Sequence, residues 1–202
     1  VTGVQTCALP ISQLDKNIVK YLKTDLSKYS NKMKSVMNNI DDSDGPVFVY
    51  SQFRDAEGIN IFAKVLEANG YLPYGYGDEN ITTVITPNVY SIDQRTGKQW
   101  KDLTDYQKKF FQPLTYMFWG DTTKNLQKRR YLLNKFNSEE NKNGNLIKVF
   151  LSTKSGTEGI SLMNVRQVHL MEPYWNTVLT EQAAGRAVRL CSDRKSTRLN
   201  SS

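Results

Sequence analysis

Histidine, cysteine and long hydrophobic runs are scarce in this 202-residue sequence. It has no run of about 18 apolar residues, so no segment is expected to span a membrane as a helix. The one histidine, His169, has no second histidine as a companion, which favours a core or edge position over a catalytic or metal-binding role. Of the two cysteines, only Cys191 lies in the part that we expect to be native, so neither a disulfide nor a cysteine-based metal site is predicted. We expect a packing role for Cys191 and a reducing, intracellular setting for the protein.

Both ends of the sequence resemble translated sequencing adapter rather than natural protein. The resemblance covers residues 1–11 and 193–202, and both are excluded from the fold prediction as scars. A signal peptide at 1–11 is disfavoured because this stretch has no basic residue and no sufficient apolar run. The native segment is therefore expected to be 12–192, cut at both ends.

The charge balance of the native segment is mildly basic. The whole sequence has 27 basic and 20 acidic residues, and removal of 193–202 leaves 24 and 19, a net charge of +5. This excess permits nucleic acid as a partner without requiring it. The length of the segment is enough for one well-buried domain.

From Pro46 onward, short apolar runs alternate with helical patterns. Strands are predicted at 47–50, 114–119, 147–151 and 165–171, and their continuous apolar character is typical of strands covered on both faces. Helices are predicted at 55–69, closed by Gly70, and at 125–137, with Thr122 as a candidate cap. The alternation predicts an α/β fold, a parallel sheet with flanking helices and right-handed crossovers. Residues 12–45 are expected to be a helical lead-in and 46–192 the main domain.

A polar, aromatic insertion at 74–113 interrupts this alternation. A hairpin is predicted around Arg95-Thr96-Gly97 and a short helix within LTDYQKKFF. A loop of this length usually has structure or function of its own. Its tyrosines, tryptophan and phenylalanines, interleaved with lysine, favour a small satellite core and leave base stacking as the alternative.

Two further features have plain default interpretations. The predicted helix at 125–137 and the residue before it carry five basic side chains, for which a solvated face is the default and a contact with phosphate the alternative: Lys124, Lys128, Arg129, Arg130 and Lys135. Glu172 ends a predicted strand beside Pro173, and the sequence shows no partner for it.

The segment EQAAGRAVRL, residues 181–190, places two arginines in a small, apolar surrounding. On a helix that turns about 100° per residue, Arg186 and Arg189 fall at about 40° and −20° from Gln182, so the three form one polar stripe. Guanidinium groups suit phosphate oxygens. Pairing with carboxylates inside the domain is an equally weighted alternative.

A glycine-containing loop, STKSGTEGISL, follows the predicted strand at 147–151. Gly156 and Gly159 would lie at the carboxyl end of that strand, where α/β folds place ligands and where free N–H groups favour anions. An ordinary tight turn is the alternative. The order strand, glycine loop, strand and arginine helix is more specific than any one of these features.

These motifs resemble the C-terminal RecA-like lobe of superfamily 2 helicases and translocases. VFVYSQF resembles motif IV, LSTKSGTEGISL resembles motif V, and QAAGRAVR fits the motif VI pattern Q-x-x-G-R-x-x-R. YMFWGDTT with the following helix is similar to the unit between motifs IV and V. HLMEPYWN brings the chain closest to Swi2/Snf2-like proteins and to the early-transcription ATPases of large DNA viruses. The resemblance covers 30–192 apart from the insertion at 74–113.

The resemblance implies a role for each matching residue. Arg189 matches the arginine finger that reaches the γ-phosphate of ATP, Arg186 its partner, and Gln182 a position that orders the nucleotide and the attacking water. Gly159 and Ser161 match positions where motif V meets the nucleotide, although many relatives carry Asp or Asn in place of Ser161. The positions expected to face the nucleic-acid backbone are Thr153, Ser51 and Gln52.

The sequence has no G-x-x-x-x-G-K-[ST] phosphate loop and no acidic box for Mg²⁺. The resemblance implies that an N-terminal RecA-like lobe of the same parent chain holds ATP and Mg²⁺, with no metal site in this chain. The expected function is the second motor lobe of a motor acting on DNA or RNA, inactive as an ATPase alone. A non-catalytic nucleic-acid-binding or scaffold module is the main alternative. A stand-alone phosphate-binding enzyme is a third possibility, which the missing phosphate loop disfavours.

Overall fold

The computed structural model describes residues 16–54, 58–75, 87–119, 126–153, 160–172 and 198–201. These form a parallel six-stranded sheet with the strand order β2-β3-β4-β1-β5-β6. The strands are β1 (Val47–Tyr50), β2 (Leu72–Pro73), β3 (Thr115–Trp119), β4 (Val149–Ser152), β5 (Gln167–Leu170) and β6 (Arg198–Ser201). The sheet and the four strands predicted from the sequence are confirmed.

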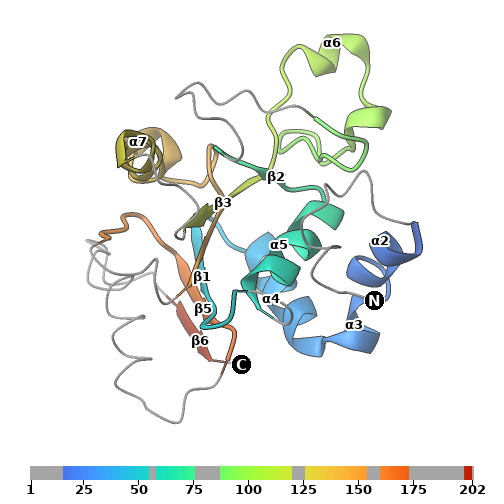
Figure 1. Ribbon diagram of the computed structural model, residues 1–202. Coiled ribbons are helices and arrows are strands. Elements are labelled where there is room, and N and C mark those ends of the chain that lie inside the picture. The colour runs from blue at the N-terminus through green and yellow to red at the C-terminus, as the bar shows by residue number, and fades with distance from the viewer. Residues whose placement is uncertain are drawn as a thin grey trace.

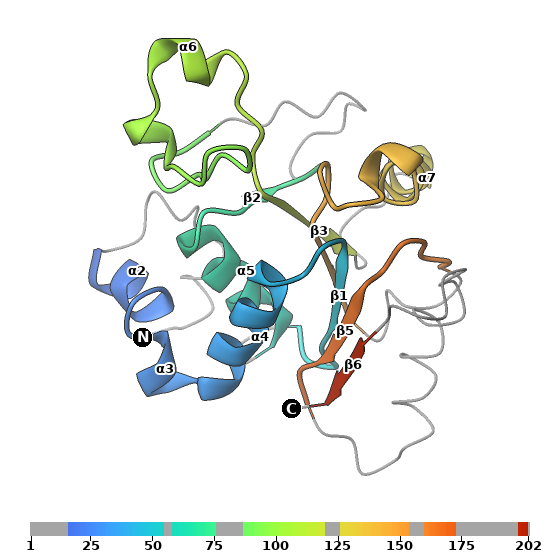
Figure 2. The same cartoon turned by 180° about the vertical axis from the view of Figure 1, so that it is seen from behind.

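Helices cover both faces of the sheet. They are α2 (Lys16–Leu22), α3 (Leu26–Tyr29), α4 (Asn31–Asp41), α5 (Ile59–Ala68), α6 (Asp105–Lys108) and α7 (Leu126–Phe136), with 3₁₀ turns at Trp100–Asp102 and Glu139–Asn141. Figures 1 and 2 show α4 and α5 on one side of the sheet and α7 on the other. No helix in the described part of the chain is long and apolar enough to cross a membrane.

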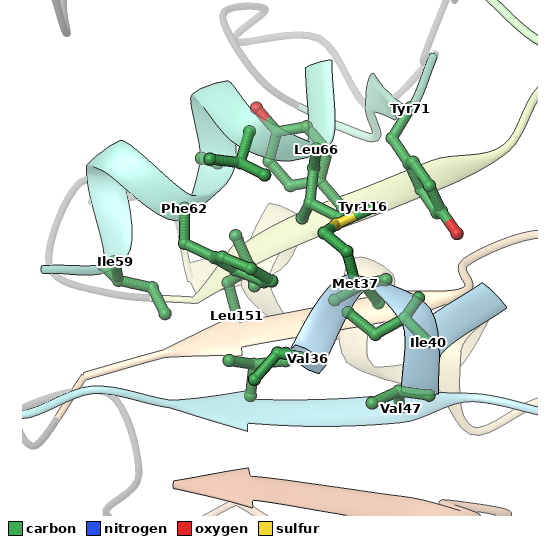
Figure 3. Close-up of a cluster of buried hydrophobic side chains, with 14 of the residues drawn as sticks. Val36, Met37, Ile40, Val47, Ile59, Phe62, Leu66, Tyr71, Tyr116 and Leu151 are labelled. Atoms are coloured by element: carbon green, nitrogen blue, oxygen red, sulfur yellow. The ribbon is translucent and has the colours of Figure 1, made fainter. Parts of the chain in front are cut away.

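Successive side chains of each strand point to opposite faces of the sheet, so the strands contribute to two hydrophobic cores. Val47 and Val49 of β1 face α4 and α5, whereas Phe48 between them faces the α7 side. Figure 3 shows the first core, in which side chains of α4 and α5 meet Val47 and Leu151. Because both faces are buried, the strands need apolar residues at successive positions, which explains the continuous runs in the sequence.

The predicted helical lead-in is divided into α2, α3 and α4. Ser30 accepts a 3.2 Å hydrogen bond from the amide of Met33, so a new helix starts after it. Val36 and Ile40 of α4 are fully buried in the first core. The lead-in therefore supplies one layer of the domain, and the boundary at residue 46 stays a prediction.

Both edges of the sheet hold strands that the sequence pattern did not predict. β2 has only two residues, one of them Pro73, which suits an edge because proline cannot donate to a neighbouring strand. β6 lies within the adapter-like residues 193–202, for which no regular structure is expected. It pairs with β5 through the backbone, and an open strand edge can accept almost any extended segment in this way. The origin of residues 193–202 stays a prediction.

The main described part of the insertion, 87–113, docks where the strands begin, since the Ile92 amide donates to the Gly70 carbonyl and the Leu114 amide to the Ile92 carbonyl. The predicted hairpin is confirmed: Ile92 pairs with Gln99, and Gly97 takes the left-handed conformation with φ of 68°. The predicted short helix is confirmed as α6, whose start is closed by Thr104 and Gln107 in a capping box. We call the side of the sheet where the strands begin its amino edge.

Candidate functional site

Four polar residues gather where the parallel strands end, which we call the carboxyl edge. The last residues of β3, β4, β1 and β5 are register partners, so these strands end side by side. Ser51 and Gln52 directly follow β1, Thr153 follows β4, and Glu172 lies just beyond β5. The fold therefore brings the predicted residues Ser51, Gln52 and Thr153 to one edge, where open parallel sheets place their ligands.

Glu172 holds the loop that follows β1, an arrangement that we call the Glu172 clamp. Its Oε1 accepts a 2.7 Å hydrogen bond from Ser51 Oγ, and its Oε2 accepts a 2.9 Å bond from the Gln52 amide. Ser51 Oγ also lies 2.8 Å from the carbonyl oxygen of Phe53, so its one proton is shared between two acceptors. It accepts a 3.1 Å bond from the Phe53 amide as well. The carboxylate of Glu172, just beyond β5, thus fixes the backbone segment that follows the neighbouring strand β1.

Local sequence patterns do not predict the Glu172 clamp. The partners of Glu172 lie 121 and 120 residues away in the chain, so no local motif connects them. The one sequence feature that points to Glu172 is its position, as an acidic residue at the end of a buried strand. Glu172 also interacts electrostatically with Lys32 of α4. Burial lowers the pKa of Lys32, and the negative charge of Glu172 opposes that shift.

The loop after β1 presents a surface next to the clamp. Phe53 is 55% exposed and Gln52 is half-buried. Ser51 is fully buried and its hydroxyl is engaged, so its side chain is placed to hold the loop, and its expected position facing nucleic acid stays a prediction. Gly58 closes the loop against α5, because a Cβ there would stand 2.0 Å from the carbonyl oxygen of Phe53.

The two described site residues that were predicted from the motif V segment, Thr153 and Ser161, lie apart from each other. Thr153 is buried at the carboxyl edge. Ser161 is exposed, and its carbonyl accepts a 2.7 Å hydrogen bond from Asn137, the residue that follows α7. Since α7 ends near the turn into β4, this contact places Ser161 toward the amino edge. The fold does not bring Ser161 together with Gln52 and Thr153.

The remaining predicted site residues, Gly159, Gln182, Arg186 and Arg189, lie outside the described residues. The same holds for Gly156, Lys124, Thr122 and Cys191. Their roles stay predictions.

The basic helix α7 is not simply a solvated face. Lys128 is buried, and the guanidinium carbon of Arg129 lies 4.8 Å from the ring centre of Trp119, the last residue of β3. Arg130 is exposed, as expected of a solvated face. Arg129 departs from a solvated face because the first turn of α7 lies beside Trp119, whose aromatic ring offers its face to a cation.

His169 is a core residue, as predicted. It is buried in β5, and its Nε2 lies 3.1 Å from Gln167 Oε1. Burial lowers the pKa of His169 to about 4, so the ring is neutral at physiological pH. Its Nδ1 has no hydrogen-bond partner within the described residues. These residues also contain no group of three or more His, Cys, Asp or Glu side chains that could hold a metal ion.

Comparison with viral proteins identifies relatives that match about four fifths of this chain. The chain is 30% identical over 167 residues to a protein of Acanthamoeba polyphaga mimivirus named as a candidate ATP-dependent RNA helicase, covering 83% of this chain and 23% of that protein. It is 32% identical over 167 residues to the termination factor NPH-I homolog of African swine fever virus, covering 81% of this chain and 23% of that protein. The chain thus spans about a quarter of the length of these relatives.

A solved structure and a family model agree with this relationship. The C-terminal part of the Fun30 ATPase domain superposes with a TM-score of 0.55 at 18% identity, covering 94% of this chain and 44% of that one. This likeness shows the fold, that of a RecA-like helicase lobe. The family model of the helicase conserved C-terminal domain matches residues 88–191. The chain therefore belongs to the helicase conserved C-terminal domain family.

Proposed function

We propose that this chain is the second motor lobe of an ATP-dependent helicase or translocase. The observation that carries the proposal is the family match over 88–191, which spans the stripe of Gln182, Arg186 and Arg189. The relative from mimivirus is named as ATP-dependent, which supports nucleotide use by the parent protein. The lobe would act with an N-terminal lobe of the same parent chain.

The stripe would complete an ATP site across the cleft between the two lobes. Guanidinium groups are permanently charged and fork-shaped, so the chemistry of this donor set fits phosphate oxygens. ATP supplies the γ-phosphoryl group, on which charge is rearranged during transfer. Arg189 would stabilise that charge, Arg186 would assist it and Gln182 would order the water, with Gly159 allowing close approach. Mg²⁺ would be held mainly by the other lobe.

The carboxyl edge would contact the nucleic acid, DNA or RNA. Gln52 and Thr153 both lie at this edge, and the Glu172 clamp fixes the loop that carries Gln52. Ser51 would contribute through the clamp rather than through direct contact. The position of Ser161 beside Asn137 gives no support for a role at this edge.

A non-catalytic scaffold module is the alternative function. The intact pattern Q-x-x-G-R-x-x-R argues against it, because a module without hydrolysis has no need for two arginines in this spacing.

An ATPase assay on the chain alone and on its full-length parent tests the proposal. We expect no hydrolysis by the chain alone, because the phosphate loop is absent from it. The parent should hydrolyse ATP faster when single-stranded DNA or RNA is added. Hydrolysis by the purified chain, or a parent without ATPase activity, would overturn the motor-lobe proposal.

A further inference from the structure

The insertion presents aromatic side chains that do not join a core. Tyr106 is 72% exposed and Phe110 is 49% exposed, and their ring centres lie 5.4 Å apart. Trp100 and Phe111 form a second, half-buried pair with ring centres 4.9 Å apart. None of these four rings belongs to the core clusters of the described residues. Trp100 and Phe111 are thus consistent with the satellite core expected from the sequence, whereas Tyr106 and Phe110 face solvent.

Positive charge surrounds these rings. The described insertion carries five basic residues, Arg95, Lys98, Lys101, Lys108 and Lys109. Arg95 Cζ lies 5.7 Å from the ring centre of Phe110, and Lys108 Nζ lies 5.6 Å from that of Trp100. Of the three acidic residues, Asp93 is fully buried, whereas Asp102 and Asp105 are exposed and Asp105 lies 3.5 Å from Lys108. Five basic residues therefore stand against two exposed acidic ones.

Hydrogen bonds hold this surface in place. Asp93 Oδ1 accepts a 2.9 Å bond from the Gln112 amide, and its Oδ2 accepts a 2.8 Å bond from Thr96 Oγ1. Gln94 Nε2 donates to the carbonyl oxygens of Pro113 at 2.6 Å and Asn145 at 3.1 Å. The rings and cations are therefore carried on a fixed frame, which lowers the entropic cost of binding a ligand.

We infer that Tyr106, Phe110 and the surrounding basic residues, here called the insertion platform, bind a single-stranded segment of nucleic acid. Exposed rings stack on unpaired bases of any sequence, and nearby cations meet the phosphates. The choice of nucleic acid over an acidic protein rests on the proposed function, which gives the chain nucleic acid as its partner. The platform lies at the amino edge, where Gln94 contacts Asn145 ahead of β4, whereas Gln52 and Thr153 lie at the carboxyl edge. Figures 1 and 2 show α6 projecting beyond β2, far from β5 and β6.

Fluorescence anisotropy with a labelled 20-nucleotide single strand, as DNA and as RNA, tests the inference on the 202-residue chain. The double variant Tyr106→Ala, Phe110→Ala should bind about tenfold or more weakly, since each stacked base contributes substantially to affinity. Replacement of Tyr106 by Trp keeps a ring and should retain binding. Tyr29→Ala is the matched control, because Tyr29 is 66% exposed on α3, outside the insertion. Melting temperatures should stay unchanged in all variants, since these side chains are exposed.

A second double variant, with both changes at the carboxyl edge, separates this inference from the proposed function. If Gln52→Ala, Thr153→Val weakens binding and the platform variant binds like the original chain, the platform is wrong and the carboxyl-edge contact stands. If only the platform variant weakens binding, the platform is supported and the carboxyl-edge contact fails. Absence of strand binding by the original chain would also overturn the platform, and it would leave the ATPase test of the motor lobe unaffected.

Discussion

Glu172 is the residue on which the geometry of the carboxyl edge depends most. Its two oxygens each accept one hydrogen bond, from Ser51 and from the Gln52 amide, so Glu172→Gln keeps the volume but offers only one acceptor. We expect the free energy of unfolding to fall by about 1–2 kcal/mol, because one buried donor loses its partner. Urea unfolding measures it. Glu139→Gln, an exposed position, should change stability by less than about 0.5 kcal/mol; equal effects of the two variants would show that the clamp contributes nothing.

His169 gives the chain an acid-sensitive core. Its pKa is about 4 in the folded protein, against 6.5 when unfolded, because burial disfavours the charged ring. Between these values the unfolded chain binds more protons, so the contribution of His169 to stability falls as pH drops below about 6.5 and levels off below about 4. Between pH 7 and pH 5 the expected loss is about 2 kcal/mol. His169→Leu should remove this part of the pH dependence in urea unfolding, and an unchanged pH dependence would refute the assignment.

At the scale of elements, Asn141 joins the end of α7 to the start of β4. Its Nδ2 donates to the carbonyl oxygens of Phe136 at 2.9 Å and Ile147 at 3.2 Å, and its Oδ1 accepts from the amides of Leu146 at 3.0 Å and Ile147 at 2.7 Å. Asn141→Ala leaves several buried backbone groups without partners, so we expect a loss of about 2–4 kcal/mol in thermal or urea unfolding. Asn143→Ala, nearby and exposed, is the control. A loss at Asn141 no larger than that at Asn143 would contradict this role.

The elements differ in whether the sequence pattern can predict them. Strands covered on both faces need runs such as VFVY, and these runs predict β1, β3, β4 and β5 directly. The sequence pattern does not predict β2 and β6, because an edge strand forms by backbone pairing and needs no run of apolar side chains. The pattern does not predict the clamp of Glu172 on Ser51 either, because side chains 121 residues apart meet only after the sheet has formed. The packing of α7 beside the end of β3, rather than its composition, places Arg129 on Trp119.

At the scale of the whole molecule, the chain belongs to the helicase conserved C-terminal domain family and spans 23% of the length of the mimivirus and African swine fever virus relatives. Its sheet gathers Gln52, Thr153 and the Glu172 clamp at the carboxyl edge, and its insertion lies at the amino edge. The family could be predicted from the sequence because motif VI has fixed spacing. The arginine stripe, in contrast, depends on a second lobe for its proposed chemistry.

The ATPase rate of the full-length parent with Arg189→Ala tests the central claim most directly. An arginine finger acts in the transition state, so kcat should fall by about 10³-fold or more while the KM for ATP changes little. Arg130→Ala, an exposed arginine on α7, should leave kcat unchanged. If kcat of the Arg189→Ala parent equals that of the unmodified parent, the finger assignment is wrong and the stripe is a structural ion-pair site.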